Sequence, residues 1–239
     1  MRRTGLHVLL ATVLLVTLGG CMYPQEKREA MRTPPAESVL IVQNAVDRFY
    51  EEQGYLPIKN FDEHTPLYER YKIDFEKLMN MQYIHTVPSS AFENGGHYYF
   101  VLVDVEENPT VKLLDLLTIQ TVGNIENDIH QYAQKNGRYP LGEPVTGGWY
   151  RLDYAALGLK SSPVKSVFSG TYTGLLIHET GAVAVDYAPD IMTLVQREQR
   201  SGWDEDEDLR KLLIDHSYFV PVRSYPYYWK EGQPVIAEP

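Results

Sequence analysis

The spacing of apolar residues predicts two amphipathic helices, at residues 39–53 and 122–136. In each segment the apolar side chains recur every three or four residues and so share one helical face. Each segment runs into a glycine, Gly54 or Gly137, a residue that suits the left-handed conformation closing many helices. The two apolar faces consist of Val39, Val42, Val46 and Phe49 in the first helix and Val122, Ile125, Ile129 and Tyr132 in the second.

The correspondence between the two segments continues beyond the helices. Residues 54–57 and 137–140 both follow the pattern Gly-x-x-Pro. Residues 71–75 and 150–154 share a second pattern, in which an aromatic, a basic and an aliphatic residue precede an aspartate and another aromatic residue. A repeated order of this kind indicates an internal duplication.

Each copy ends in two alternating segments typical of a β-hairpin. The predicted strand pairs are residues 97–105 with 111–114, and residues 172–178 with 182–187. The sequence therefore predicts an α+β fold, built by tandem duplication of an amphipathic helix followed by a small antiparallel sheet. In such a duplication we expect Asp74 and Asp153 to occupy equivalent turns or helix caps.

The end of the second helix, residues 132–140, joins an amphipathic helix to a small sheet through Gly137 and Pro140. This segment resembles the soluble head domain of type IV pilins and type II secretion pseudopilins, and residues 49–57 carry a weaker version of it. The resemblance implies a pilin-like fold for both repeats. It does not imply filament assembly, because pilins have a long apolar N-terminal helix, whereas a polar stretch precedes the first repeat.

The N-terminal region has the composition of an export signal. Arg2 and Arg3 precede an apolar stretch at residues 6–18, which is shorter than the roughly 20 residues that a membrane-spanning helix needs. We therefore expect five parts in the chain. These are a signal peptide at 1–20, a flexible tether at 21–38, pilin-like repeats at 39–115 and 116–188, and a C-terminal extension at 189–239 with helices and an aromatic strap.

Residues 18–21, Leu-Gly-Gly-Cys, resemble the lipobox of bacterial lipoproteins, and they contain the single cysteine of the chain. The resemblance implies that Cys21 becomes the first residue of the mature protein and carries acyl groups such as palmitate. Two or more acyl chains are enough for stable membrane attachment. The expected location is the extracytoplasmic face of the cell membrane. The alternative is an unmodified cysteine at the end of an ordinary signal peptide.

The formal net charge of −10 argues against a nucleic acid as partner. We find no catalytic residues, no metal site and no cofactor-binding motif. The histidines are scattered without ligand spacing, and neither a nucleophile elbow nor a phosphate loop is present. The acidic run at 204–208 suits the N-terminus of a helix at 209–215 better than a calcium loop, which remains the alternative.

Aromatic residues gather among prolines near the end of the chain, at Tyr225, Tyr227, Tyr228 and Trp229. Two interpretations remain open. The segment is either a strap that buries its rings against the repeats, or a docking surface for a protein or glycan partner.

These features favour a non-enzymatic, membrane-anchored scaffold or interaction module with an unidentified envelope protein as partner. One alternative is the solute-binding lipoprotein of an ABC transporter, which predicts repeated strand–helix alternation in two α/β lobes. A second alternative is an enzyme without a recognisable motif.

Overall fold

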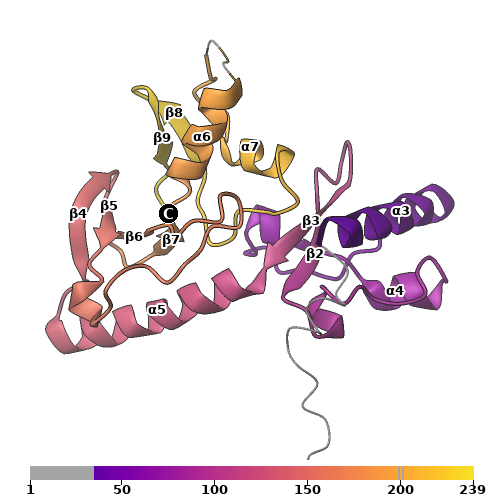
Figure 1. Cartoon of the computed structure of the whole chain (residues 1–239), viewed down its shortest axis with the longest axis horizontal. Helices are drawn as coiled ribbons and strands as arrows, with labels where there is room; N and C mark the ends of the chain where they lie inside the picture. Colours follow the sequence, from indigo (N-terminus) through magenta and orange to yellow (C-terminus); the bar gives the residue numbers. More distant parts are fainter. Residues whose placement is uncertain (1–34, 199, 201) are drawn as a thin grey trace, which may run out of the picture. The chain divides into compact units, whose positions relative to one another are not determined.

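The computed structural model describes residues 35–198, 200 and 202–239, and these belong to one compact unit with an α+β fold. We call the part from α3 to β3 the first module, the part from α5 to β7 the second module, and the remainder the C-terminal segment (Figure 1). The first module contains α3 (Pro35–Gln53), η1 (Leu67–Glu69), β1 (Tyr71–Lys72), α4 (Phe75–Asn80), η2 (Phe92–Asn94), β2 (Tyr98–Val103) and β3 (Thr110–Asp115). The second contains α5 (Leu116–Asn136), β4 (Leu141–Thr146), β5 (Trp149–Leu152), η3 (Ala155–Leu157), β6 (Leu175–His178) and β7 (Val183–Val185). The C-terminal segment contains α6 (Ala188–Glu198), α7 (Arg210–Asp215), β8 (Tyr227–Lys230) and β9 (Gln233–Ile236).

Both predicted helices are present, and both begin earlier than expected. α3 starts at Pro35, inside the expected tether, because proline suits the first turn of a helix and Ser38 is buried, where its hydroxyl accepts a hydrogen bond from Ser90. α5 starts at Leu116, where the Asp115 carboxylate caps it by accepting from the backbone N–H groups of Leu117 and Thr118.

Both helices end as predicted, at glycines in the left-handed conformation. The φ angle is 74° at Gly54 and 69° at Gly137. The N–H of Gly54 donates to the carbonyl of Tyr50, and that of Gly137 to the carbonyl of Ala133, which satisfies one terminal carbonyl of each helix.

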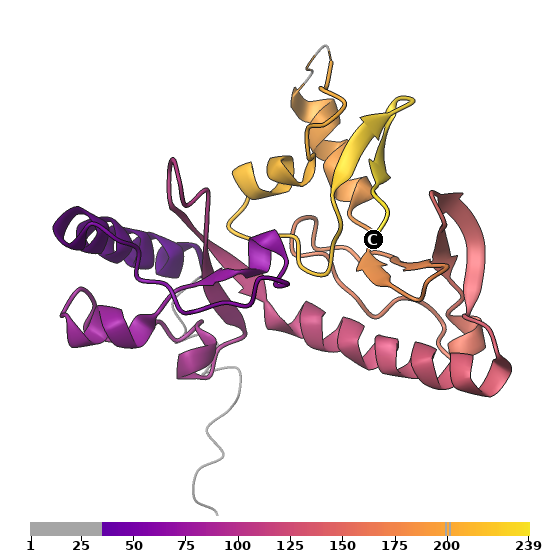
Figure 2. The same ribbon diagram turned by 180° about the vertical axis from the view of Figure 1, so that it is seen from behind.

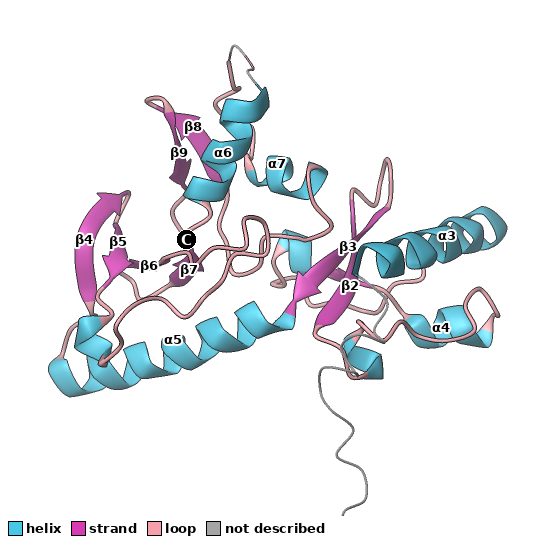
Figure 3. Cartoon of the chain, in the orientation of Figure 1, coloured by secondary structure: helices cyan, strands magenta, loops and turns pink. Residues whose placement is uncertain are grey.

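The strands form three antiparallel sheets, with orders β1-β2-β3, β4-β5-β6-β7 and β8-β9 (Figure 3). The hairpins β2–β3 and β6–β7 confirm the two predicted strand pairs. The β4–β5 hairpin was not predicted, because Gly142 and Pro144 give β4 the composition of a loop. β4 is correspondingly irregular, with shifts of register along β5 and mostly exposed side chains.

The two modules share specific contacts at corresponding positions. The N–H of Asp74 donates to the carbonyl of Pro57 at 2.8 Å, and the N–H of Asp153 donates to the carbonyl of Pro140 at 3.0 Å. Each aspartate side chain also accepts from the N–H three residues later, at 3.1 Å in both cases. Asp74 and Asp153 thus occupy equivalent caps, which supports the expected duplication.

Each helix packs against the sheet of its own module, as Figures 1 and 2 show for α3 beside β2 and β3. The predicted apolar face of α3 is fully buried with Phe100, Leu102, Val111 and Leu113. In α5, Val122, Ile125 and Ile129 are buried with Leu175, Ile177, Val183 and Val185. Tyr132 was wrongly placed on this buried face, since it is only half-buried in the last part of the helix.

The C-terminal segment closes the outer edges of the sheets in both modules. Beside β3, the N–H of Leu113 donates to the carbonyl of Tyr218 at 2.7 Å, and the N–H of Val220 donates to the carbonyl of Leu113 at 3.0 Å. Beside β7, the N–H of Val185 donates to the carbonyl of Arg223 at 2.9 Å. One extended stretch, residues 218–223, therefore pairs with two sheets, and we call it the edge segment.

Candidate functional site

The expected lipid attachment site, Cys21, lies outside the described residues, as do the expected signal peptide and most of the expected tether. In the described part of the chain, no helix is long and apolar enough to cross a membrane.

The C-terminal aromatic residues pack against the second module. Tyr227 is 1% exposed and its hydroxyl accepts from the N–H of Tyr187 at 3.2 Å, so its ring belongs to the core. Burial raises the pKa of Tyr227 well above its ordinary value. Tyr225 lies on Trp149 with ring centroids 5.3 Å apart, and Trp229 lies 6.4 Å from Trp203. Tyr228 is half-buried on β8.

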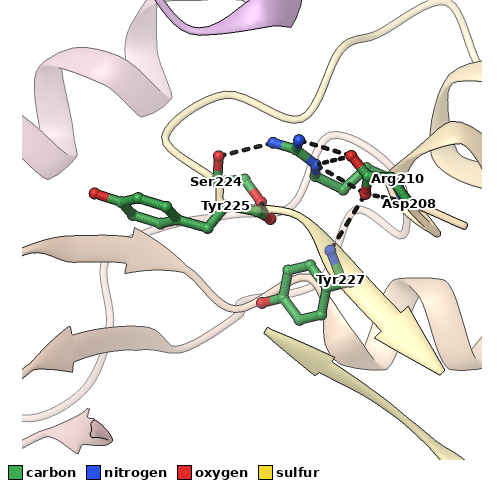
Figure 4. A network of polar contacts seen from close by, with 5 residues as sticks. All are labelled: Asp208, Arg210, Ser224, Tyr225 and Tyr227. Atoms are coloured by element: carbon green, nitrogen blue, oxygen red, sulfur yellow. Dashed lines mark hydrogen bonds and ion pairs between the residues drawn. The ribbon is translucent and has the colours of Figure 1, made fainter. Parts of the chain in front are cut away.

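A polar network fixes the start of this aromatic segment (Figure 4). The Asp208 carboxylate accepts from the guanidinium of Arg210, with the closest N–O distance at 2.7 Å, and from the backbone N–H of Tyr227 at 3.2 Å. Arg210 in turn donates to the carbonyl of Ser224 at 2.8 Å. The Arg210 side chain is 9% exposed and that of Asp208 25%, so their ion pair is partly shielded from water.

Asp208 of the acidic run and two of the histidines make contacts within the fold. Asp208 accepts from the backbone N–H of Arg210, at the first turn of α7. His178 is buried, with Nδ1 2.8 Å from the Thr180 hydroxyl, and His216 Nε2 lies 2.9 Å from Glu198. Among the described residues, no group of three or more His, Cys, Asp or Glu side chains could hold a metal ion.

A groove of about 720 Å³ lies beside the first module. We call it the module-1 groove. Val103 and Thr110, which are paired across β2 and β3, lie along it. Leu67 and Tyr68 form one wall, Lys211, Ile214 and Asp215 of α7 form another, and the β2–β3 turn at residues 104–108 forms a rim.

Two ionisable groups beside the groove have shifted pKa values. Burial raises the pKa of the Tyr68 phenol to about 12, with a further contribution from the negative charge of Asp208. Burial lowers the pKa of Lys112. The Lys112 ammonium donates to the carbonyls of Ile214 at 2.6 Å and Ser217 at 2.7 Å, so it holds the end of α7 against β3.

Sequence reasoning did not identify the module-1 groove. Its walls come from segments more than a hundred residues apart, brought together by contacts such as that of Lys112 with Ile214. The acidic residues in the turn after β2 were the one local feature that could have indicated the groove, and the sequence predicted only a hairpin turn there.

The described residues form an α+β fold with an open groove beside the first module. Residues 35–115 match the family model of the YphF family N-terminal domain. The matched range begins at the first residue of α3 and ends at the last residue of β3, so it covers the first module, about a third of the chain. No curated protein and no solved structure matches the chain.

Proposed function

We propose that the chain is an extracytoplasmic lipoprotein whose folded part acts as a non-enzymatic scaffold or interaction module at the cell membrane. The observation that carries the proposal is the sequence Leu18-Gly19-Gly20-Cys21 directly after a basic and apolar signal-like segment. If the residues between Cys21 and α3 act as a flexible tether, a diacylated cysteine at this point would hold the folded part close to the membrane, because about 15 such residues reach only about 20 Å on average.

The folded part of this lipoprotein consists of two tandem modules with a pilin-like arrangement of helix and sheet. The equivalent contacts of Asp74 and Asp153 support the duplication. The pilin resemblance supplies the shape of a module and no filament role.

The alternative role, the solute-binding component of an ABC transporter, predicts two α/β lobes with helices between parallel strands. The sheets of the described residues are antiparallel, with each strand of a hairpin following the other directly. Thermal unfolding in the presence of amino acids, sugars and oligopeptides tests this alternative. Any saturable rise in Tm with a small solute would favour it over the scaffold.

The anchor is tested by changing Cys21→Ala and labelling a bacterial host with an alkyne analogue of palmitate. The variant is expected to take up no label and to accumulate as the unprocessed precursor. The matched control is Gly20→Ala, which keeps a small residue before the cysteine and should be labelled and processed normally. Mature-sized Cys21→Ala protein that still sediments with membranes would contradict the anchor.

A further inference from the structure

Each main sheet has two faces, one covered by the long helix of its module and one that we call the outer face. Tyr71 pairs with Leu102 in the first module, and Tyr150 pairs with Ile177 in the second. Tyr71 and Tyr150 hold corresponding positions in the sequence pattern, so their partners Leu102 and Ile177 are equivalent. The residue that follows each partner, on β2 and on β6, is then also equivalent. Val103 of β2 therefore corresponds to His178 of β6.

In the second module the chain covers this position with its own C-terminal segment. Trp149 pairs with His178 across β5 and β6, and their rings lie 5.2 Å apart on the outer face. The Tyr225 ring packs on Trp149, and the Trp149 indole donates to the carbonyl of Ala237 at 2.8 Å. The outer face of the second module is thus covered by an extended polypeptide segment that contains aromatic side chains.

In the first module the corresponding residue, Val103, is also buried, at 9% exposure against 7% for His178, but it lines the module-1 groove. α7 and the edge segment cover one part of the outer face, where Ile214, Val220 and Val222 pack on Val101 and Leu114. Near Val103 and Thr110 the groove remains, with apolar walls that include Leu67 and Ile214. Leu67 is 54% exposed, so much of its apolar side chain is open to solvent.

The charges around the groove favour a basic occupant. Asp104, Glu106 and Glu107 line its rim, and none of the three forms an ion pair within the described residues. The two lysines of the groove do not offset them fully. The Lys112 ammonium faces two carbonyl groups, and Lys211 lies 3.5 Å from Asp215.

We propose that the module-1 groove binds an extended polypeptide segment of a partner protein, with an aromatic side chain in the groove and a lysine or arginine against the acidic rim. The segment takes the place that Tyr225 and Ala237 take on the second module. The proposal rests on the proposed role as an interaction module, and its test does not require lipid attachment at Cys21.

The full-length protein is tested with a fluorescein-labelled peptide of residues 222–230, Val-Arg-Ser-Tyr-Pro-Tyr-Tyr-Trp-Lys, whose sequence comes from the segment that covers the second module. Fluorescence anisotropy is expected to show saturable binding. A second peptide, with Glu in place of Arg223 and Lys230, should bind at least about tenfold more weakly because it meets the acidic rim with like charge.

A pair of double variants tests the charge of the rim. Glu106→Lys with Glu107→Lys is expected to weaken binding about tenfold, because it replaces two negative charges of the rim by positive ones. The matched control is Glu51→Lys with Asp128→Lys. It changes the net charge by the same amount at exposed positions of α3 and α5, outside the groove, and should leave binding unchanged.

A pair of single variants tests the apolar wall. Leu67→Ser is expected to weaken binding about fivefold, because the groove loses apolar surface that the peptide would cover. Leu40→Ser removes a leucine of similar exposure, 57%, from α3 and should have no effect.

The proposal is overturned if the peptide shows no saturable binding, or if the control variants weaken it as much as the groove variants do. Palmitate labelling of Cys21 separates this outcome from failure of the anchor. Normal labelling without peptide binding rejects the groove alone, and peptide binding by unlabelled Cys21→Ala protein supports the groove independently of the anchor.

Discussion

At the scale of single residues, glycine has opposite effects at two positions of α5. Gly137 closes the helix with φ of 69°, a conformation that L-residues with a side chain rarely adopt, and a Cβ there would meet no atom within 4 Å. Gly123 lies inside the same helix, and a Cβ there would meet only the Arg223 guanidinium at 3.9 Å. Backbone conformation, and not space, therefore separates the two sites.

Substitution of each glycine by alanine is expected to change stability in opposite directions. Gly137→Ala should lower the free energy of unfolding by about 1 kcal/mol because of its positive φ. Gly123→Ala should raise it by about 0.5–1 kcal/mol, because alanine loses less conformational freedom in a helix. Urea titration followed by circular dichroism measures both, and a loss of stability in Gly123→Ala would contradict this assignment.

Asp186 makes the free energy of unfolding depend on pH. Burial raises the pKa of its carboxyl group, while its hydrogen bond from the N–H of Ala188 and the positive charge of Arg151 oppose the rise. The pKa of Asp186 is higher in the folded state than in the unfolded state, so the protonated carboxyl favours folding. This contribution to stability is fully present below the unfolded pKa and is lost as the pH rises through the folded pKa.

The variant Asp186→Asn, which mimics the protonated carboxyl, is therefore expected to be more stable than the wild type at pH 7. The difference should shrink as the pH falls, because the wild-type carboxyl then takes up its proton. Unfolding by urea at pH 7 and across the acidic range measures this. A variant less stable than the wild type at pH 7 would show that the ion pair with Arg151, at 3.8 Å, outweighs the desolvation of the carboxylate.

At the scale of elements, the aspartate caps link the two modules. Asp74 caps α4 and Asp153 caps the turn at η3 through the same hydrogen bond from the third following residue. Both also tie the strand before them to the Gly-x-x-Pro segment through their own N–H groups.

We expect Asp74→Ala and Asp153→Ala each to cost about 1 kcal/mol of stability, since both remove one capping bond of equal length. Asp74→Asn and Asp153→Asn keep an oxygen acceptor and serve as controls with smaller losses. Chemical denaturation of the four variants provides the comparison. If only one of the alanine variants loses stability, the two caps are not equivalent.

Helices and hairpins were predictable from sequence because their signals are local. The apolar spacing of Val122, Ile125 and Ile129 and the glycine at 137 define α5 without knowledge of any distant residue. The same applies to the β2–β3 hairpin. The beginning of α5 was less clear, because the capping Asp115 is also the last residue of a strand.

Long-range pairing was not predictable in the same way. The contacts of Leu113 with Tyr218 and Val220 depend on main-chain groups, which every residue carries. One wall of the module-1 groove is formed by α7, and the position of α7 is fixed partly by hydrogen bonds from the buried Lys112. From sequence, a lysine within a strand is predicted to be exposed, because buried lysines are rare.

At the scale of the molecule, the edge segment makes the stability of each module depend on the other. Residues 218–223 pair with β3 of the first module and β7 of the second, so unfolding of either exposes backbone groups of the other. We therefore expect one cooperative unfolding transition for residues 35–239.

The tryptophans allow this to be tested without labels. Trp149, Trp203 and Trp229 all lie outside the first module, whereas far-ultraviolet circular dichroism reports on both modules. Unfolding curves from tryptophan fluorescence and from circular dichroism should coincide. Replacement of Val220 by proline removes the N–H that bonds to Leu113 and should separate the two curves, while two separate transitions in the wild type would contradict the coupling.

The order in which the chain is synthesised gives the pairing of Leu113 with Tyr218 a further consequence. These residues are 105 positions apart, so at about 5–20 residues per second β3 waits roughly 5–20 seconds for the segment that completes its edge. During that interval the nascent first module exposes an unpaired strand, which is a template for pairing with other chains. A holdase or slow export that keeps the early chain extended would thus protect the protein until its last residues arrive.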